Sequence, residues 1–287
     1  MTQVDHFLHV GNQLGEGPLW NIKEGALYWV DIEGECFFRY FPNTEKLESF
    51  QVGQPVGCLA FRHDGNLQMA VREGIGFWDW ETQTVNIVTN PEADRIGARF
   101  NDGRVDRRGR FWAGTMGEDN QSKLYRLDPD GSSQTMETGI TISNGIGWSP
   151  DDRTMYYTDT PLRVIYAYDF DLERGEIKNR REFVKVPLTE GFPDGLTVDS
   201  EGFVWSAQWD GWRVTRYDPD GEVERVISLP AQRPTSCAFG GPDLNQLYIT
   251  SAWTGLKDIE RQEQPFAGDL FRVITEVKGQ PENIFRG

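Results

Sequence analysis

The stretch that decides the fold is SNGIGWSPDDRTMYYTD, at residues 143–159. A short segment of glycine and apolar residues meets a turn built from Ser, Pro and Asp. An aromatic segment that contains Tyr156 and Tyr157 then follows. Turn residues of this kind between two short apolar segments predict two strands joined by a hairpin.

The same pattern occurs six times along the chain. The copies run LGEGPLWNIKEGALYWVD (14–31), VGCLAFRHDGNLQMAV (56–71), FNDGRVDRRGRFWAG (100–114), SNGIGWSPDDRTMYYTD (143–159), PDGLTVDSEGFVWSA (193–207) and TSCAFGGPDLNQLYITS (235–251). In several copies a further strand follows, as in IYAYDFDLERG and VTRYDPDGE. An all-β sandwich would also give many strands, but it would not predict so regular a repeat.

Counting along the chain fixes the register of the repeat. Asn101 and Asp194 each lie 11 residues before a tryptophan, Trp112 and Trp205 respectively. The equivalent positions are 16, 57, 101, 144, 194 and 236, spaced by 41, 44, 43, 50 and 42 residues. One four-stranded propeller blade takes about 40–50 residues. The sequence therefore predicts an all-β fold, a six-bladed β-propeller that forms a single domain over residues 1–287.

Composition narrows the class of protein further. The 287 residues carry a formal net charge of −16, which disfavours binding to phosphate backbones, so no nucleic-acid partner is expected. The chain contains no run of about 18 apolar residues, and its first segment, MTQVDHFLHVGNQ, does not resemble a signal peptide; no membrane partner is expected. The three separated cysteines, Cys36, Cys58 and Cys237, indicate reduced thiols and a cytoplasmic location. Because no feature of the sequence requires a stable oligomer, a monomer or weak oligomer is expected.

The propeller prediction brings the six equivalent positions together in space. The first strand of every blade lines the central channel, so equivalent residues converge on its axis. They are Glu16, Gly57, Asn101, Asn144, Asp194 and Ser236 (or its neighbour Thr235). Two carboxylates and two amides in a partly desolvated channel would repel or stay unpaired without a cation. The alternative is that these residues only cap turns, as Asn-Gly and Asp-Gly dipeptides commonly do. That alternative explains a single such residue well, but it explains less well why four polar residues occur at equivalent positions of the repeat.

The residue types at these positions indicate which ion would bind. Carboxylate and amide oxygens suit a hard divalent ion, so Ca²⁺ is expected first, with Mn²⁺, Mg²⁺, Fe²⁺ or Zn²⁺ as alternatives. None of the three histidines, His6, His9 and His63, falls at a channel position. We expect all three to be solvated or packed, which leaves a Ser/His/Asp triad unsupported. A metal site at one end of the channel is the prediction.

Several segments resemble the regucalcin/gluconolactonase family of six-bladed propellers (senescence marker protein-like), in particular its bacterial sugar lactonases. They are Leu14–Pro18 (LGEGP), Arg99–Gly103 (RFNDG), Ala113–Met116 (AGTM), Ile142–Gly145 (ISNG), Pro193–Gly195 (PDG) and Cys237–Gly241 (CAFGG). The resemblance follows the chain in order over nearly its whole length, and each motif sits at a blade boundary.

The resemblance implies a specific set of site residues. A divalent metal would be held by Glu16, Asn144 and Asp194. Arg99 and Asn101 would contact sugar hydroxyls, with Asn101 close enough to serve as a ligand instead. An acidic substrate contact follows the Gly-Thr-Met segment, where counting from Arg99 favours Asp119 over Glu118.

The resemblance also implies the reaction, which is the opening of a sugar lactone to its aldonic acid. Glucono-, xylono-, arabinono- and galactonolactone are the expected substrate types. The metal would polarise the lactone carbonyl, and Asp194 is the candidate catalytic general base toward water. An aryl esterase or phosphotriesterase of the paraoxonase kind is the alternative enzyme, and a calcium-binding scaffold without catalysis is the non-enzymatic alternative.

Two further features bear on the substrate. Trp205, Trp209, Trp212 and Trp253 could wall a sugar pocket, since aromatic faces stack on sugar rings. Core packing between blades explains Trp205, and likewise Trp112, more simply. Residues 253–266 (WTGLKDIERQEQPF) predict a longer loop, either a lid or a simple insertion.

Overall fold

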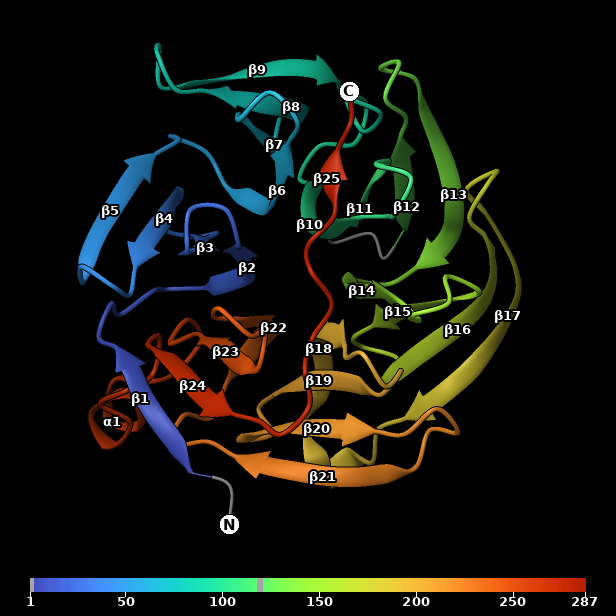
Figure 1. Cartoon of the computed structure of the whole chain (residues 1–287). Coiled ribbons are helices and arrows are strands. Elements are labelled where there is room, and N and C mark those ends of the chain that lie inside the picture. Colours follow the sequence, from blue (N-terminus) through green and yellow to red (C-terminus); the bar gives the residue numbers. More distant parts are fainter. Residues whose placement is uncertain (1–2, 118–120) are drawn as a thin grey trace.

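Six antiparallel sheets are arranged as blades around a central channel (Figure 1). This computed structural model describes residues 3–117 and 121–287. Strand order in the sheet equals order along the chain in four of the six; of the other two, one adds β25 beside its innermost strand and one takes β1 as its outermost strand. The predicted six-bladed propeller is confirmed.

The strands divide by their place in the blade. The innermost strands are β2 (Gly15–Asn21), β6 (Val56–Arg62), β10 (Arg99–Val105), β14 (Ser143–Trp148), β18 (Phe192–Val198) and β22 (Pro234–Gly240). The second strands are β3 (Ala26–Asp31), β7 (Leu67–Val71), β11 (Phe111–Met116), β15 (Thr154–Asp159), β19 (Val204–Trp209) and β23 (Gln246–Ser251). The third strands are β4 (Cys36–Phe41), β8 (Gly74–Asp79), β12 (Ser122–Leu127), β16 (Val164–Asp171), β20 (Arg213–Tyr217) and β24 (Leu270–Ile274).

The outermost strands are β5 (Lys46–Gln51), β9 (Thr84–Thr89), β13 (Ser133–Ile140), β17 (Glu176–Lys185), β21 (Val223–Ser228) and β1 (Val4–Leu8). Burial falls steeply from the inside to the outside of a blade. Every residue of β14 and β22 is buried, whereas β5 and β9 are mostly exposed. Most of the apolar core lies on the inner three strands, although Phe50 of β5 also contacts Trp78 of the next blade.

The ring is closed by the strand nearest the N-terminus. β1 pairs with β24 and supplies the outer strand of the blade whose other strands come from residues 234–274. This pairing joins two parts of the chain that lie more than 260 residues apart, as in the pair Val4 and Val273. The blade is complete only when both ends of the chain have folded.

A buried aspartate anchors the tryptophan at the end of the hairpin in two blades. Asp199 is fully buried, and its carboxylate accepts the Trp205 indole N–H at 2.8 Å and two guanidinium bonds from Arg216 at 2.7 and 3.0 Å. Asp106 binds Trp112 and Arg110 in the same way. Trp112 and Trp205 are therefore core residues, as the simpler prediction held.

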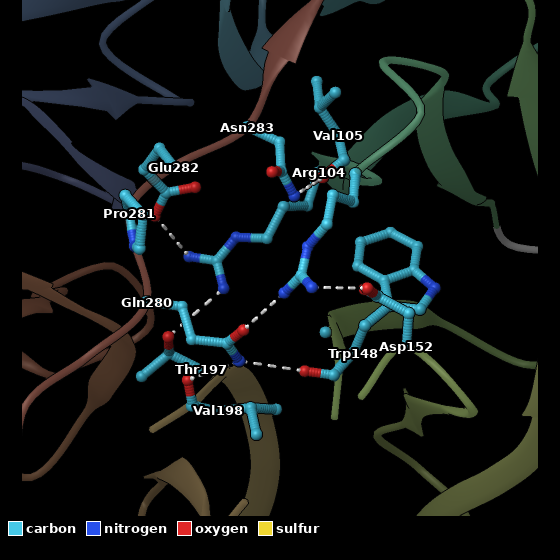
Figure 2. Close-up of a pocket in the computed structure, with 12 residues that line it drawn as sticks. Arg104, Val105, Trp148, Asp152, Thr197, Val198, Gln280, Pro281, Glu282 and Asn283 are labelled. Carbon is cyan, nitrogen blue, oxygen red and sulfur yellow. Dashed lines mark hydrogen bonds and ion pairs between the residues drawn. The ribbon is translucent and has the colours of Figure 1, made fainter. Parts of the chain in front are cut away.

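The C-terminal segment crosses one end of the channel (Figure 1). The Gln280 amide donates to the carbonyls of Trp148 and Val198, the last residues of β14 and β18. Arg104 of β10 forms an ion pair with Glu282 at 3.2 Å (Figure 2). The segment then ends in β25 (Ile284–Phe285), which pairs parallel to β6.

A cavity of about 180 Å³ remains between this segment and the inner strands (Figure 2). Deeper in the channel, a void of only about 10 Å³ is lined by residues that include Cys58, Asp102 and Ser236. The middle of the channel is thus filled by side chains, as in other small propellers.

The remaining elements are short. They are η1 (Leu188–Glu190) and α1 (Asp258–Glu263). α1 lies within the predicted 253–266 loop, which is tied to the N-terminal segment by the Trp253 indole N–H on the carbonyl of Gly11. All three cysteines are buried and unpaired, and burial raises the pKa of Cys36 and of Cys237 to about 12. No helix in the described part of the chain is long and apolar enough to span a bilayer.

The anchoring of Trp205 yields a stability prediction. Asp199→Ala is expected to lower the free energy of unfolding by about 3–5 kcal/mol, because the buried indole N–H and two backbone N–H groups lose their acceptor and Arg216 loses its one fully buried carboxylate. Urea unfolding followed by tryptophan fluorescence measures the change. Asp243→Ala is the matched control at an exposed position and should stay within about 0.5 kcal/mol of the parent. A near-neutral Asp199→Ala would contradict the anchoring role.

Candidate functional site

The innermost strands each carry one extra residue near the end where they begin. In β10 the pairs with β11 jump from Phe100–Thr115 to Gly103–Ala113, so that three steps on one strand oppose two on the other. The same shift occurs in β2, β6, β14, β18 and β22. A bulge of this kind turns side chains out of the regular pleat. It sets the direction of the predicted site residues in all six blades.

The hydrogen-bond register confirms the equivalence of the six positions. In three blades the inner strand pairs with an aromatic residue of the second strand, in the pairs Leu19–Tyr28, Gly147–Tyr156 and Thr197–Trp205. Glu16, Asn144 and Asp194 each lie three residues before the first member of these pairs. In the closing blade, Ala238 pairs with Tyr248, which makes Thr235 rather than Ser236 the equivalent residue. The Thr235 hydroxyl bonds to the carbonyl of Gly15 and to Thr250.

Gly57 occupies the same position in the second blade, for a steric reason. A Cβ atom at this position would overlap the backbone of Asn101 and Phe100 in the next blade. Glycine therefore permits the close approach of β6 and β10, beside one of the predicted site residues. The expected small residue on one side of the site is present.

Glu16 is buried at the beginning of β2 and lies within the field of other carboxylates. Burial raises the pKa of Glu16 well above its usual range, and the negative charges of Asp194 and Asp102 raise it further. The backbone N–H of Gly17 donates to one carboxylate oxygen at 2.9 Å, and Arg99 favours the charged form. Asp194 therefore lies close enough to Glu16 to act on its pKa, although the two residues belong to different blades.

Asp194 has a similar environment. Burial is the largest cause of its strongly raised pKa, followed by the Asp102 carboxylate, while Asn144 and Arg99 oppose the shift. Its Oδ1 atom is buried and has no hydrogen-bond partner among the described residues. A buried carboxylate oxygen without a partner is costly, so this atom is a candidate ligand for a cation.

Asn144 is oriented by a residue of the neighbouring hairpin. Its Nδ2 donates to the Thr160 hydroxyl at 3.1 Å, and Thr160 donates in turn to the carbonyl of Pro193 at 2.8 Å. Because the amide nitrogen is held, the Oδ1 atom is left as the free end, and it too is buried without a partner in the described chain. Thr160 thus orients a predicted ligand in the manner of an outer-shell residue at a metal site.

Asn101 differs from Asn144 because both ends of its amide are engaged. The Arg99 guanidinium donates to Asn101 Oδ1 at 2.6 Å, and Asn101 Nδ2 donates to the carbonyl of Ser143 at 2.8 Å. Desolvation lowers the pKa of Arg99 to about 10, against the attraction of Glu16 and Glu33. Arg99 remains a cation at neutral pH, and it faces the site rather than forming an isolated surface ion pair.

The donor set fits a hard divalent cation. Glu16 and Asp194 offer carboxylates whose charged forms are disfavoured by burial, and Asn144 offers a neutral oxygen aimed by Thr160. A divalent ion would neutralise the two carboxylates and satisfy the orphaned oxygens at once. The assignment of these three residues as ligands stays a prediction.

The other predicted contacts are placed less fully. Glu118 and Asp119 lie outside the described residues. Trp212 is exposed, whereas Trp209 and Trp253 each carry an arginine over the ring, Arg233 and Arg261, at 4.7 and 3.8 Å from the ring centroid. One face of each of these two rings is therefore covered, and sugar stacking would have to use the other.

Two residues of the site escape analysis of the sequence. Thr160 lies in a turn of an adjacent hairpin, where nothing in the repeat marks it. Asp102 follows Asn101 in what reads as an Asp-Gly turn, yet the bulge in β10 directs its carboxylate into the channel, where burial raises its pKa to about 6. The sequence does offer a clue to Asp102, because this carboxylate directly follows Asn101, a predicted channel residue.

Fold and site together define the class: six-bladed propellers with buried carboxylates, amides and an arginine where the inner strands begin. Within that class, residues 14–253 match the family described as the SMP-30/Gluconolactonase/LRE-like region, and the chain belongs to this family.

Individual relatives agree with the family over nearly the whole chain. Regucalcin from Xenopus laevis is 38% identical over 285 residues, covering 96% of this chain and 95% of that protein. A 6-deoxy-6-sulfogluconolactonase from Pseudomonas putida is 39% identical over 280 residues, with 96% and 95% covered. The solved structure of regucalcin from Agrobacterium tumefaciens, described as a calcium-binding protein, matches with a TM-score of 0.93 at 29% identity, covering 97% of this chain and 95% of that one.

The raised pKa values predict how stability depends on pH in the metal-free protein. Between the ordinary carboxyl range near pH 4 and the raised values, the folded protein binds more protons at Glu16 and Asp194 than the unfolded chain does. Stability in chelator should therefore fall as pH rises through this window, and Asp102, with a pKa of about 6, extends the same trend.

Removing one of these charges should reverse the effect. Glu16→Gln is expected to raise the melting temperature of the metal-free protein at pH 7 and to flatten its dependence on pH between 5 and 7.5. Thermal unfolding in chelator measures both. Glu276→Gln, at an exposed glutamate, is the control and should follow the parent. A lower melting temperature for Glu16→Gln at pH 7 would show that the charge of Glu16 does not destabilise the metal-free protein.

Proposed function

We propose that this protein hydrolyses a sugar lactone to the corresponding aldonic acid, using one divalent cation held by Glu16, Asn144 and Asp194. The observation that carries the proposal is the buried pair of carboxylates, with an orphaned amide oxygen and the half-buried Arg99 beside them. Membership of a family whose relatives include a named sugar lactonase supports it. Aldonolactones such as glucono-, xylono-, arabinono- and galactonolactone are the substrates to test.

Ca²⁺ is the ion that we propose. All three ligands present oxygen atoms, and oxygen ligands of mixed charge are what Ca²⁺ prefers. The description of the Agrobacterium relative as calcium-binding supports the same choice. Zn²⁺, Mn²⁺, Mg²⁺ and Fe²⁺ also accept carboxylate oxygens and compete for such a site.

The bound ion would act as a Lewis acid that polarises the lactone carbonyl and stabilises negative charge on its oxygen. The chain supplies the remaining functions. Arg99 is held on Asn101 and presents a fixed positive charge to the substrate. Its other donors and the Asn101 amide would orient ring hydroxyls, which sets the carbonyl carbon in line with the attacking water.

Asp194 is the proposed general base. A water held by its carboxylate loses a proton to Asp194 as its oxygen bonds to the carbonyl carbon. When the tetrahedral species collapses, the bond from that carbon to the ring oxygen breaks, and the proton passes from Asp194 to the ring oxygen, which becomes the hydroxyl of the aldonic acid.

The polar lining favours a sugar over the alternative substrates. A pocket for aryl esters or phosphotriesters would be more apolar than one built around Arg99, Asn101 and two carboxylates. A calcium-binding scaffold would need the carboxylates and the amide but would have no use for the half-buried arginine held on Asn101. The substrate panel and the base variant below separate these possibilities.

The first test is a panel of aldonolactones with and without chelator. We expect acid release, followed with a pH indicator, on at least one lactone, with loss of activity in chelator and recovery on adding Ca²⁺. Paraoxon and phenyl acetate serve as comparison substrates and should be turned over far more slowly. Preferential turnover of the aryl substrates would favour the esterase alternative, and no turnover of any compound would favour the scaffold.

The second test concerns the base. Asp194→Asn should lower kcat by about 10²–10⁴-fold, the usual contribution of a general base. Metal content is measured in the same preparation, because loss of the ion would lower activity for a different reason. His63→Gln, an exposed substitution outside the site, is the control. Full lactonase activity in Asp194→Asn would remove this residue from the catalytic step.

A further inference from the structure

A second group of metal-ligand side chains lies in the blade that closes the ring. His6, in β1, and His9, just beyond it, both reach Asp269, which directly precedes β24. His6 Nε2 lies 2.8 Å and His9 Nδ1 lies 2.9 Å from the same oxygen, Asp269 Oδ2. One ligand atom from each residue falls within 4.8 Å of the others. These histidines are thus gathered on a carboxylate, not simply solvated or packed as the sequence suggested.

Asp269 differs from two other buried aspartates, Asp31 and Asp159 at the ends of β3 and β15, in how its two oxygens are used. Asp31 and Asp159 also receive two consecutive backbone N–H groups from the chain entering the inner strand, but each uses both of its oxygens to do so. In Asp269, the N–H groups of Val10 and Gly11 both bind Oδ1. The other oxygen is left for the two imidazoles.

The arrangement has the features of a supported metal site. The Asp269 side chain is 1% exposed, and its orientation is fixed by the two backbone bonds. The His9 side chain is 78% exposed, so solvent has access to one side of the cluster. Backbone N–H groups that hold a carboxylate in place are the outer-shell support found at metal centres. Two imidazoles and one carboxylate with an open side can bind a transition metal with water as a further ligand.

We propose that His6, His9 and Asp269 form a second cation site, specific for a borderline transition-metal ion such as Zn²⁺, that fastens β1 to the closing blade. On binding, each imidazole turns a lone pair toward the ion and carries its proton on its other ring nitrogen. The nitrogen ligands select against Ca²⁺, which prefers oxygen. This site therefore differs in ion preference from the oxygen-only site at the channel.

The consequence follows from where the three residues lie. Two of them are on the N-terminal segment, and the third directly precedes β24, the strand that β1 pairs with, so the ion would bridge the ring closure itself. A ligand that binds only the folded state stabilises it in proportion to the logarithm of its concentration over the dissociation constant. Zn²⁺ should therefore raise the melting temperature through this closure, independently of any effect on catalysis.

The test uses the fact that the chain has only three histidines, His6, His9 and His63. Zn²⁺ is titrated into protein that already holds excess Ca²⁺, and the histidine ring signals are followed by NMR together with the melting temperature. We expect the ring signals of His6 and His9 to shift while those of His63 stay unchanged. We also expect one Zn²⁺ to bind per chain under these conditions and the melting temperature to rise by several degrees.

Two variants make the outcome decisive. His9→Gln alters an exposed side chain, so the protein should fold and retain its activity on lactones, but it should lose the Zn²⁺-dependent rise in melting temperature. His63→Gln should keep that rise in full. The proposal is overturned if His6 and His9 do not respond to Zn²⁺ while Ca²⁺ is present. It is also overturned if His9→Gln retains the full stabilisation by Zn²⁺.

Discussion

The arrangement at the channel depends on two carboxylates that the ring forces together. Glu16 and Asp194 lie in blades far apart in sequence, yet both are buried, and the negative charge of Asp194 raises the pKa of Glu16. Folding drives this approach because the inner strands bury continuous apolar surface between blades, as in the fully buried strands β14 and β22. The free energy gained by packing the blades is what holds like charges at one end of the channel.

Much of this arrangement can be predicted from the repeat. A propeller converts equal positions along the chain into neighbours around an axis, so counting alone assembled Glu16, Asn144 and Asp194. The closing blade shows the limit of counting, because only the hydrogen-bond register distinguishes Thr235 from Ser236. Asp102 and Thr160 could not be placed in the same way. Their roles depend on a bulge and on a contact between adjacent hairpins, and neither leaves a periodic trace in the sequence.

The two ends of the channel have different physical tasks. Where the inner strands begin, bulges turn polar side chains out of the regular pleat, and these side chains form the proposed metal site. Where they end, the C-terminal segment covers the channel, and its polar groups are paired with strand ends, as Glu282 is with Arg104. Covering one end excludes water from the channel interior and keeps the local dielectric low. A low dielectric strengthens both the repulsion between the carboxylates and their attraction to a cation.

The central claim is that scattered oxygens gather around one ion, and a crystal structure of the protein grown with Ca²⁺ tests it most directly. The account predicts a single ion at the beginning of the inner strands, bound at about 2.3–2.6 Å by oxygens of Glu16, Asn144 and Asp194, with Arg99 still on Asn101. An ion bound elsewhere, with these three side chains turned away from one another and no density between them, would contradict it.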